Sequence, residues 1–126
     1  MNTVTLAFLG DAFFELSVRR RLAESGSVLA ADRLHRTAVR YVKASSQAAA
    51  IRSIMSREEL SEDELDVVRR ARNRKPKSVP KNTDPVDYKL ATGFEALIGQ
   101  HYIAGNTGRA EELVGMAMGI IDGSEG

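Results

Sequence analysis

The chain lacks cysteine and tryptophan altogether and has only two histidines, His35 and His101, among its 126 residues. Without cysteine there is no disulfide framework, no thiolate chemistry and no Cys-ligated metal, and two histidines do not suggest a zinc site. No apolar run approaches the roughly 20 residues that cross a bilayer, and no basic-plus-apolar secretory leader precedes the first predicted element. We therefore expect a cytoplasmic protein.

The composition that remains is that of a globular domain with unevenly distributed charge. Apolar residues make up 43% and charged residues 28% of the chain, and the net charge is +1, which is ordinary for a domain of this length. An acidic cluster at 58–66 is followed directly by a basic segment, residues 69–81, which holds seven of the 18 Lys and Arg residues and no acid. Such a segment can contact phosphate groups although the whole chain is nearly neutral.

Apolar residues at helical spacing dominate the chain and predict five helices. These cover about 5–24, 32–55 with a break near 45–46, 61 into the basic segment, 84–104, and the segment around 113–121. Three of the starts carry N-terminal signals: an N-cap at Asp32, a capping box of Ser61 with Glu64, and Asp84 before Pro85. A proline-interrupted basic loop lies at about 72–83. No segment predicts a strand, so the expected fold is all-α, in a single domain over residues 1–126.

Two of the predicted helices each carry a carboxylate inside an apolar segment. Asp11 lies in LAFLGDAFFEL, where eight of eleven residues are Leu, Ala or Phe, and Glu95 lies in FEALIG. A helix that is apolar all round is expected to be buried, and a buried ionised carboxylate is costly unless it is paired or binds a metal. One such acid is ordinarily explained by a salt bridge or a cap. Two, with no basic residue nearby in either apolar segment, favour a shared cation.

The ligands available to that cation are all oxygen atoms, which favours a hard ion, Mg²⁺ or Mn²⁺. Mg²⁺ keeps several waters, so two carboxylates suffice, and such an ion supports phosphodiester hydrolysis. Gly10, Gly93 and Gly99 lie beside the two acids. Each costs about 1 kcal/mol relative to Ala inside a helix, so we interpret them as points of close helix packing that bring Asp11 and Glu95 together.

Five stretches resemble the ribonuclease III family, over about residues 4–121. FLGDAFFEL resembles the family signature, and FEALIG resembles its second catalytic motif. RLHRTAVRYVKASSQA, LSEDELDVVRRARNRK and PKNTDPVDYKLATGFEALIGQHY resemble the Mini-III branch, which is a ribonuclease III domain without a double-stranded-RNA-binding domain.

The resemblance implies a homodimeric, Mg²⁺-dependent endoribonuclease, with Mn²⁺ as a substitute, that cuts double-stranded RNA and matures the 23S ribosomal RNA precursor. Asp11 and Glu95 match the family's catalytic acids and are the expected catalytic and metal-binding residues. The basic residues expected to contact RNA are Arg72, Arg74, Lys75, Lys77 and Lys81. Candidate positioning residues near the site are Glu15, Tyr88 and Thr92, although a solvated or salt-bridged role is the stronger interpretation for Glu15.

The sequence itself supports a dimer only through an excess of apolar helix face, notably around Phe8, Phe14 and Tyr102. It also departs from the family pattern. Ala7 and Thr92 stand where full-length ribonuclease III usually has a Glu and an Asp, and Ala71 stands where the branch tends to have Gly. Because the Mini-III branch generally shares the reduced acid set, we expect a sparser site with more water around the metal.

Three other functions fit parts of the sequence. A catalytically inactive ribonuclease III-like RNA-binding or structural protein is the first, but it needs neither Asp11 nor Glu95. A helical interaction module needs no basic loop. A helical nucleotide hydrolase usually shows several acids at E-x-x-E or E-x-x-D spacing, whereas this chain has one acid in each apolar segment. The endoribonuclease is therefore the leading interpretation.

Overall fold

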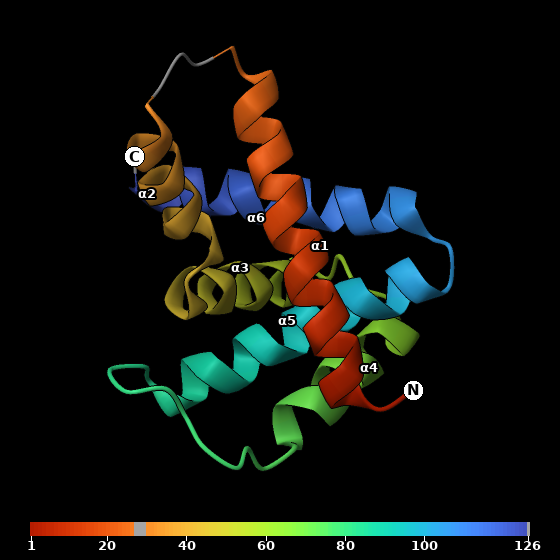
Figure 1. Ribbon diagram of the computed structural model, residues 1–126. Coiled ribbons are helices and arrows are strands. Elements are labelled where there is room, and N and C mark those ends of the chain that lie inside the picture. Colours follow the sequence, from red (N-terminus) through yellow and green to blue (C-terminus); the bar gives the residue numbers. More distant parts are fainter. Residues whose placement is uncertain (27–29, 126) are drawn as a thin grey trace.

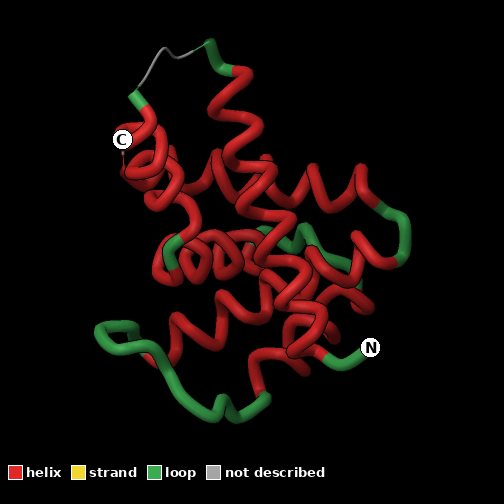
Figure 2. The backbone as a smooth tube through the Cα atoms, in the orientation of Figure 1, coloured by secondary structure: helices red, strands yellow, loops and turns green. Residues whose placement is uncertain are grey.

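The computed structural model describes residues 1–26 and 30–125, which form six α-helices and no strand (Figure 1). The helices are α1 (Thr3–Glu24), α2 (Ala31–Val42), α3 (Ala44–Ser56), α4 (Glu62–Asn73), α5 (Pro85–Ile103) and α6 (Thr107–Glu125). The longest described connection is the loop at 74–84, the long green segment at the foot of Figure 2. The all-α fold expected from the sequence is confirmed. Within these described ranges, no helix is long and apolar enough to span a membrane.

The helix boundaries follow the predicted signals with three differences. The capping box is present, because Ser61 accepts from the backbone of Glu64 at 3.1 Å while the Glu64 carboxylate accepts from the backbone of Ser61 at 2.9 Å. The break between α2 and α3 falls at Lys43, a little earlier than expected. The N-cap of α2 is Ala30, so the prediction for Asp32 is wrong; Asp32 lies in the first turn, where the helix dipole favours an acid. Helix α4 continues to Asn73, so the basic loop begins at 74 rather than 72.

Helix α5 occupies the centre of the molecule and packs against α1, α3, α4 and α6. Its side chains are apolar around most of the circumference, and Phe94 packs edge-on against Phe14 of α1 with ring centroids 5.3 Å apart. Because α5 packs against four other helices, its backbone is held firmly in place. It carries Glu95.

Glycines allow α1 and α5 to cross with their backbones in contact. A Cβ atom on Gly10 would lie 1.7 Å from the carbonyl oxygen of Glu95, and one on Gly99 would lie 1.9 Å from the carbonyl oxygen of Leu6. No side chain fits at either position, which confirms the predicted close packing. Gly93 differs from the prediction because its neighbour is Val68 of α4, not α1.

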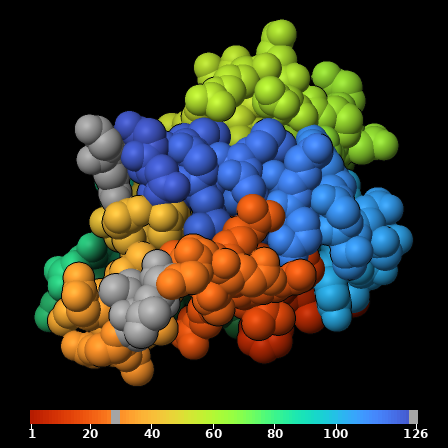
Figure 3. All heavy atoms as spheres, turned by 90° about the horizontal axis from the view of Figure 1, so that it is seen from above, coloured from red at the N-terminus to blue at the C-terminus, as the bar shows by residue number. Residues whose placement is uncertain are grey.

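Helix α6 is held between α1 and α4 by polar contacts. Seen from above, α6 in blue lies between the orange end of α1 and the yellow-green residues that lead into α4 (Figure 3). Arg21 of α1 donates to the carbonyl oxygen of Glu111 at 2.9 Å. On the other side, Arg109 donates to both carboxylate oxygens of Glu64, at 2.9 and 3.0 Å, and His101 bonds the same carboxylate at 2.7 Å. Burial alone would raise the pKa of Glu64, but the bonds from Arg109, the Ser61 backbone and His101 lower it to about 2.

One face of α1 stays open to solvent. Phe8 is 76% and Leu16 is 68% exposed, and Val4 is exposed on the same stripe. The expectation that α1 is buried all round is therefore wrong for the single chain. Phe14 is fully buried against α5, so it does not belong to the excess apolar face predicted around it.

Candidate active site

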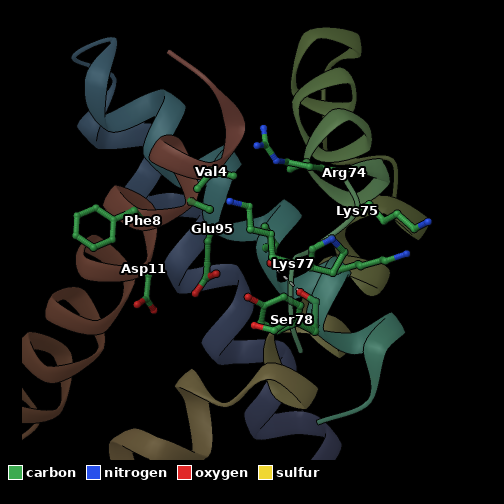
Figure 4. A pocket seen from close by; sticks show the side chains of 14 residues that line it. Val4, Phe8, Asp11, Arg74, Lys75, Lys77, Ser78 and Glu95 are labelled. Carbon is green, nitrogen blue, oxygen red and sulfur yellow. Dashed lines mark hydrogen bonds between the residues drawn. The ribbon is translucent and has the colours of Figure 1, made fainter. Parts of the chain in front are cut away.

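The crossing of α1 and α5 places Asp11 and Glu95 on one cavity of about 580 Å³. In Figure 4 the two carboxylates lie side by side and point the same way, one from each helix. Asp11 directly follows Gly10, and it is the carbonyl of Glu95 that approaches Gly10. The close packing thus brings the acids together, as predicted. The predicted burial of Asp11 is wrong for the single chain, where its side chain is exposed, whereas Glu95 is largely buried.

Burial and the neighbouring Asp11 disfavour the ionised form of Glu95. Burial, together with the hydrogen bond and charge of Asp11, raises the pKa of Glu95 from 4.5 to about 9. The single influence in the other direction is a hydrogen bond from Gln47. Folding therefore leaves an acid pair that protein groups neutralise poorly.

This arrangement fits a hard divalent cation, because a pair of adjacent carboxylates needs positive charge and offers only oxygen atoms. Among residues 1–26 and 30–125, no group of three or more His, Cys, Asp and Glu is gathered closely enough to hold a metal ion. The protein thus offers two carboxylates at this place, and water would complete the shell of any ion bound there.

The positions that depart from the family pattern also line this cavity. Ala7, Ala71 and Thr92 are all at its wall. Small or uncharged side chains at Ala7 and Thr92, where the family pattern has two acids, lower the negative charge of the cavity and leave space in it.

The basic loop reaches the same cavity. Arg74, Lys75 and Lys77 line it, and Figure 4 shows them on the other side of the cavity from the acid pair, with the Lys75 side chain pointing away from the acids. The other two predicted RNA contacts lie off the cavity: Arg72 is in the last turn of α4, and Lys81 is exposed further along the loop.

Lys89 is a fourth cation at the cavity and was missed by the sequence reasoning. It lies six residues before Glu95 on α5, and among the described residues its ammonium group has no ion-pair or hydrogen-bond partner. The signal was available, because Lys89 follows Tyr88 in the first half of the same helix. The residue does not stand out in the sequence, because it is a single cation outside the continuous basic segment at 69–81.

The three candidate positioning residues behave differently. Tyr88 and Thr92 line the cavity, but the Thr92 hydroxyl donates to the backbone carbonyl of Tyr88 at 2.9 Å, which commits its proton to the helix. Glu15 is paired with Arg19 at 2.8 Å and is not at the cavity wall. The salt-bridged interpretation of Glu15 is therefore the one that the structure favours.

A family model for the Ribonuclease III domain matches residues 4–106 of this chain. Since the match covers well over half of the chain, the protein belongs to the ribonuclease III family.

Within that family the similarity is to the Mini-ribonuclease 3 branch. The chain is 49% identical over 119 residues to the Mini-ribonuclease 3 of Symbiobacterium thermophilum, covering 94% of this chain and 89% of that protein. It is 45% identical over 122 residues to that of Brevibacillus brevis, covering 97% and 89%. A crystal structure of a Fusobacterium nucleatum protein superposes with a TM-score of 0.81 at 27% identity, over 93% of this chain and 91% of that one.

Proposed function

We propose that this chain is a divalent-metal-dependent endoribonuclease that hydrolyses phosphodiester bonds in double-stranded RNA. The observation that carries the proposal is one cavity lined both by the acid pair, Asp11 and Glu95, and by the cations Arg74, Lys75 and Lys77. Acids alone would suit many hydrolases, and cations alone would suit RNA binding. Together they suit cleavage of a phosphate backbone.

Asp11 and Glu95 would hold the metal, for which we propose Mg²⁺, with Mn²⁺ as a substitute. A divalent ion supplies Lewis acidity and lowers the pKa of water, which is the chemistry that phosphodiester hydrolysis needs. The protein's own contribution is to fix two carboxylates in a rigid helix crossing and to provide cations for the phosphates. We assign Arg74, Lys75, Lys77 and Lys89 to phosphate contact near the acid pair, and Arg72 and Lys81 to contacts further along the duplex.

Recognition of a duplex suits a surface of this composition. A-form RNA is recognised mainly by its shape, its phosphates and its 2′-hydroxyl groups, which a basic loop can contact. Single-stranded RNA is usually held by stacking on aromatic side chains, and the loop at 74–84 has none. We therefore propose that the substrate is double-stranded.

We further propose a homodimer, with one site for each strand of the duplex. The exposed stripe of Val4, Phe8 and Leu16 on α1 is supporting evidence, because an apolar row on a folded chain indicates an interaction surface. We propose that residues 1–126 act as a single catalytic domain. In support, α6 begins directly after the family match ends at residue 106, and it packs against α1, α3 and α5 of the matched part.

As the biological substrate we propose the precursor of 23S ribosomal RNA. The proposal rests on the similarity to the Mini-III branch. It is tested by sequencing the ends of 23S RNA in cells with and without this protein. Mature ends formed equally well in both would contradict it.

The enzymatic proposal is tested by incubating the purified chain with a duplex RNA and, separately, with each of its strands. Cleavage of the duplex in Mg²⁺ or Mn²⁺, and none in a chelator, is the expected result. Binding without cleavage in every metal would favour the inactive RNA-binding alternative. A chain that neither binds nor cuts would be an interaction module.

A further inference from the structure

We propose that Gln47 is the positioning residue of Glu95, and that it sets the metal affinity of the acid pair from outside the cavity. The inference rests on the proposed function, in which Glu95 holds a divalent ion. Gln47 lies on α3, is 2% exposed and is not at the cavity wall, so it acts through Glu95 and not on RNA or metal directly.

The side-chain amide of Gln47 connects Glu95 to the junction of α2 and α3. Its Nε2 atom donates to the carbonyl oxygen of Val42 at 2.8 Å and lies 3.4 Å from Oε2 of Glu95. Val42 is the last residue of α2, where carbonyl groups lack partners inside the helix. One amide group thus caps a helix end and also reaches the candidate metal ligand.

The carbonyl of Val42 fixes which end of the amide faces Glu95. A backbone carbonyl only accepts hydrogen bonds, so a flipped amide would place Gln47 Oε1 against another acceptor. Nε2 is therefore the atom at this position, and Glu95 meets a donor. An ionised carboxylate accepts from such a donor, so Gln47 favours the form and the orientation of Glu95 that a cation requires.

The other end of the amide shows that this arrangement has a cost. Gln47 Oε1 is buried and has no hydrogen-bond partner anywhere in the described residues. A buried acceptor left unpaired is destabilising, and an apolar side chain of the same shape would avoid it. An amide is therefore present at this position although it destabilises the fold at Oε1, and its other end contacts Glu95.

Restraint of Glu95 matters more in this site than in a site with many acids. With only two carboxylates, the metal depends on each of them, and a carboxylate that rotates freely loses side-chain entropy when it binds an ion. Groups that orient a metal ligand typically change metal affinity by roughly 10- to 100-fold. We expect the lower part of that range for Gln47, because its contact with Glu95 is long.

Ser46 provides a matched control for the role of the junction alone. It is buried beside Gln47, and its hydroxyl donates to the carbonyl oxygen of Arg40 at 2.6 Å. Ser46→Ala therefore removes a side-chain bond at the same α2–α3 junction without touching Glu95. A purely structural role of Gln47 would make the two positions equivalent.

The test measures Mn²⁺ affinity without RNA, by electron paramagnetic resonance of the free ion, and the Mg²⁺ dependence of duplex cleavage in a single turnover. Gln47→Met keeps the shape of the side chain and removes the donor. We expect it to weaken Mn²⁺ binding about tenfold and to raise the Mg²⁺ concentration for half-maximal rate by a similar factor. Ser46→Ala should leave both quantities unchanged. In the Glu95→Gln background, Gln47→Met should have no further effect on metal binding.

Wild-type Mn²⁺ affinity in folded Gln47→Met would overturn the inference, as would equal losses in Ser46→Ala. If Gln47→Met does not fold, Gln47→Asn replaces it, because its shorter amide cannot reach both Val42 and Glu95, and the same loss is expected. Wild-type metal binding by Glu95→Gln would instead contradict the proposed function itself. If Glu95→Gln loses Mn²⁺ affinity while the Gln47 variants keep wild-type affinity, only the positioning role of Gln47 is contradicted.

Discussion

At the scale of single residues, Glu95 is a carboxyl group whose ionised form the metal-free folded chain disfavours. Burial and the neighbouring Asp11 raise its pKa from 4.5 to about 9. Between these two pH values the folded chain holds a proton that the unfolded chain has released. The free energy of unfolding of the metal-free protein therefore falls as the pH rises through this window.

Replacing Glu95 with Gln should remove this cost. In a chelator at pH 7.5, we expect Glu95→Gln to be more stable than the wild type by about 1–3 kcal/mol, a difference that shrinks toward pH 5. Urea unfolding across this pH range measures it. Adding Mg²⁺ should stabilise the wild type and leave the variant unchanged. Equal pH dependence of the two proteins would show that Glu95 ionises normally.

At the scale of helices, the crossing of α1 and α5 depends on its glycines. Gly99→Ala would press a Cβ atom onto the carbonyl oxygen of Leu6, so the helices would have to separate. We expect a loss of about 3 kcal/mol or more, beyond the usual cost of overpacking because the neighbour is backbone. Gly119 on α6 is the control, since nothing lies within 4 Å of a Cβ there. Gly119→Ala should stabilise by about 0.5–1 kcal/mol. Thermal unfolding of both variants measures these changes in stability. A Gly99→Ala protein as stable as the wild type would contradict the close packing of α1 against α5.

The loop at 74–84 should act on binding, because its cations line the cavity opposite the acids. Replacing Arg74, Lys75 and Lys77 with Ala should weaken duplex binding and flatten its dependence on salt. With fewer phosphate contacts, binding releases fewer counterions from the RNA. The loss should be similar for unrelated duplexes. Lys81→Ala, away from the cavity, serves as the control with a smaller effect. Binding is measured by titration at several salt concentrations in Ca²⁺, and an unchanged salt slope would show that the loop does not hold RNA.

The positions of the helices were predicted from the sequence more accurately than the faces by which they pack together. Local signals such as the Ser61 capping box act within a few residues and can be interpreted without tertiary structure. The outward face of α1 could not be predicted in the same way, because a helix with apolar residues on every side does not indicate which side meets the core. Gly10 held that information, since a glycine against another backbone must face inward. Likewise, the hydrogen bond of Gln47 to Glu95 joins residues 48 positions apart, and no local pattern predicts it.

At the scale of the whole molecule, the exposed stripe on α1 is the proposed dimer interface. Leu16 is suited to a test because it is 68% exposed and lies away from the cavity. Leu16→Asp should leave the chain folded and weaken the dimer by roughly tenfold or more. Val39→Asp, at an exposed apolar position on α2, is the matched control and should stay dimeric. Sedimentation at micromolar concentration distinguishes them, and a wild-type chain that sediments as a monomer would contradict the proposal.

The two acids that we propose as catalytic were predicted from the sequence, and the structure adds what surrounds them. The motifs around Asp11 and Glu95 are local and specific, so both residues stood out before their distance in space was known. Lys89 and Gln47 did not, because each gains its significance from the cavity or from a partner on another helix. The basic segment was recognised as a whole, whereas the division between Arg74, Lys75 and Lys77 at the cavity and Arg72 and Lys81 away from it required the end of α4 to be located.

The most direct test of the proposed enzyme is the single-turnover rate of duplex RNA cleavage by Asp11→Asn and Glu95→Gln at saturating protein and Mg²⁺. Both variants keep the shape of the side chain and remove its charge, so fold, dimer and duplex affinity should remain. The rate should fall by several orders of magnitude in each, because charge at these two positions holds the cation. Near-normal cleavage by either variant, with normal dependence on Mg²⁺, would contradict the assignment of the acid pair as the active site.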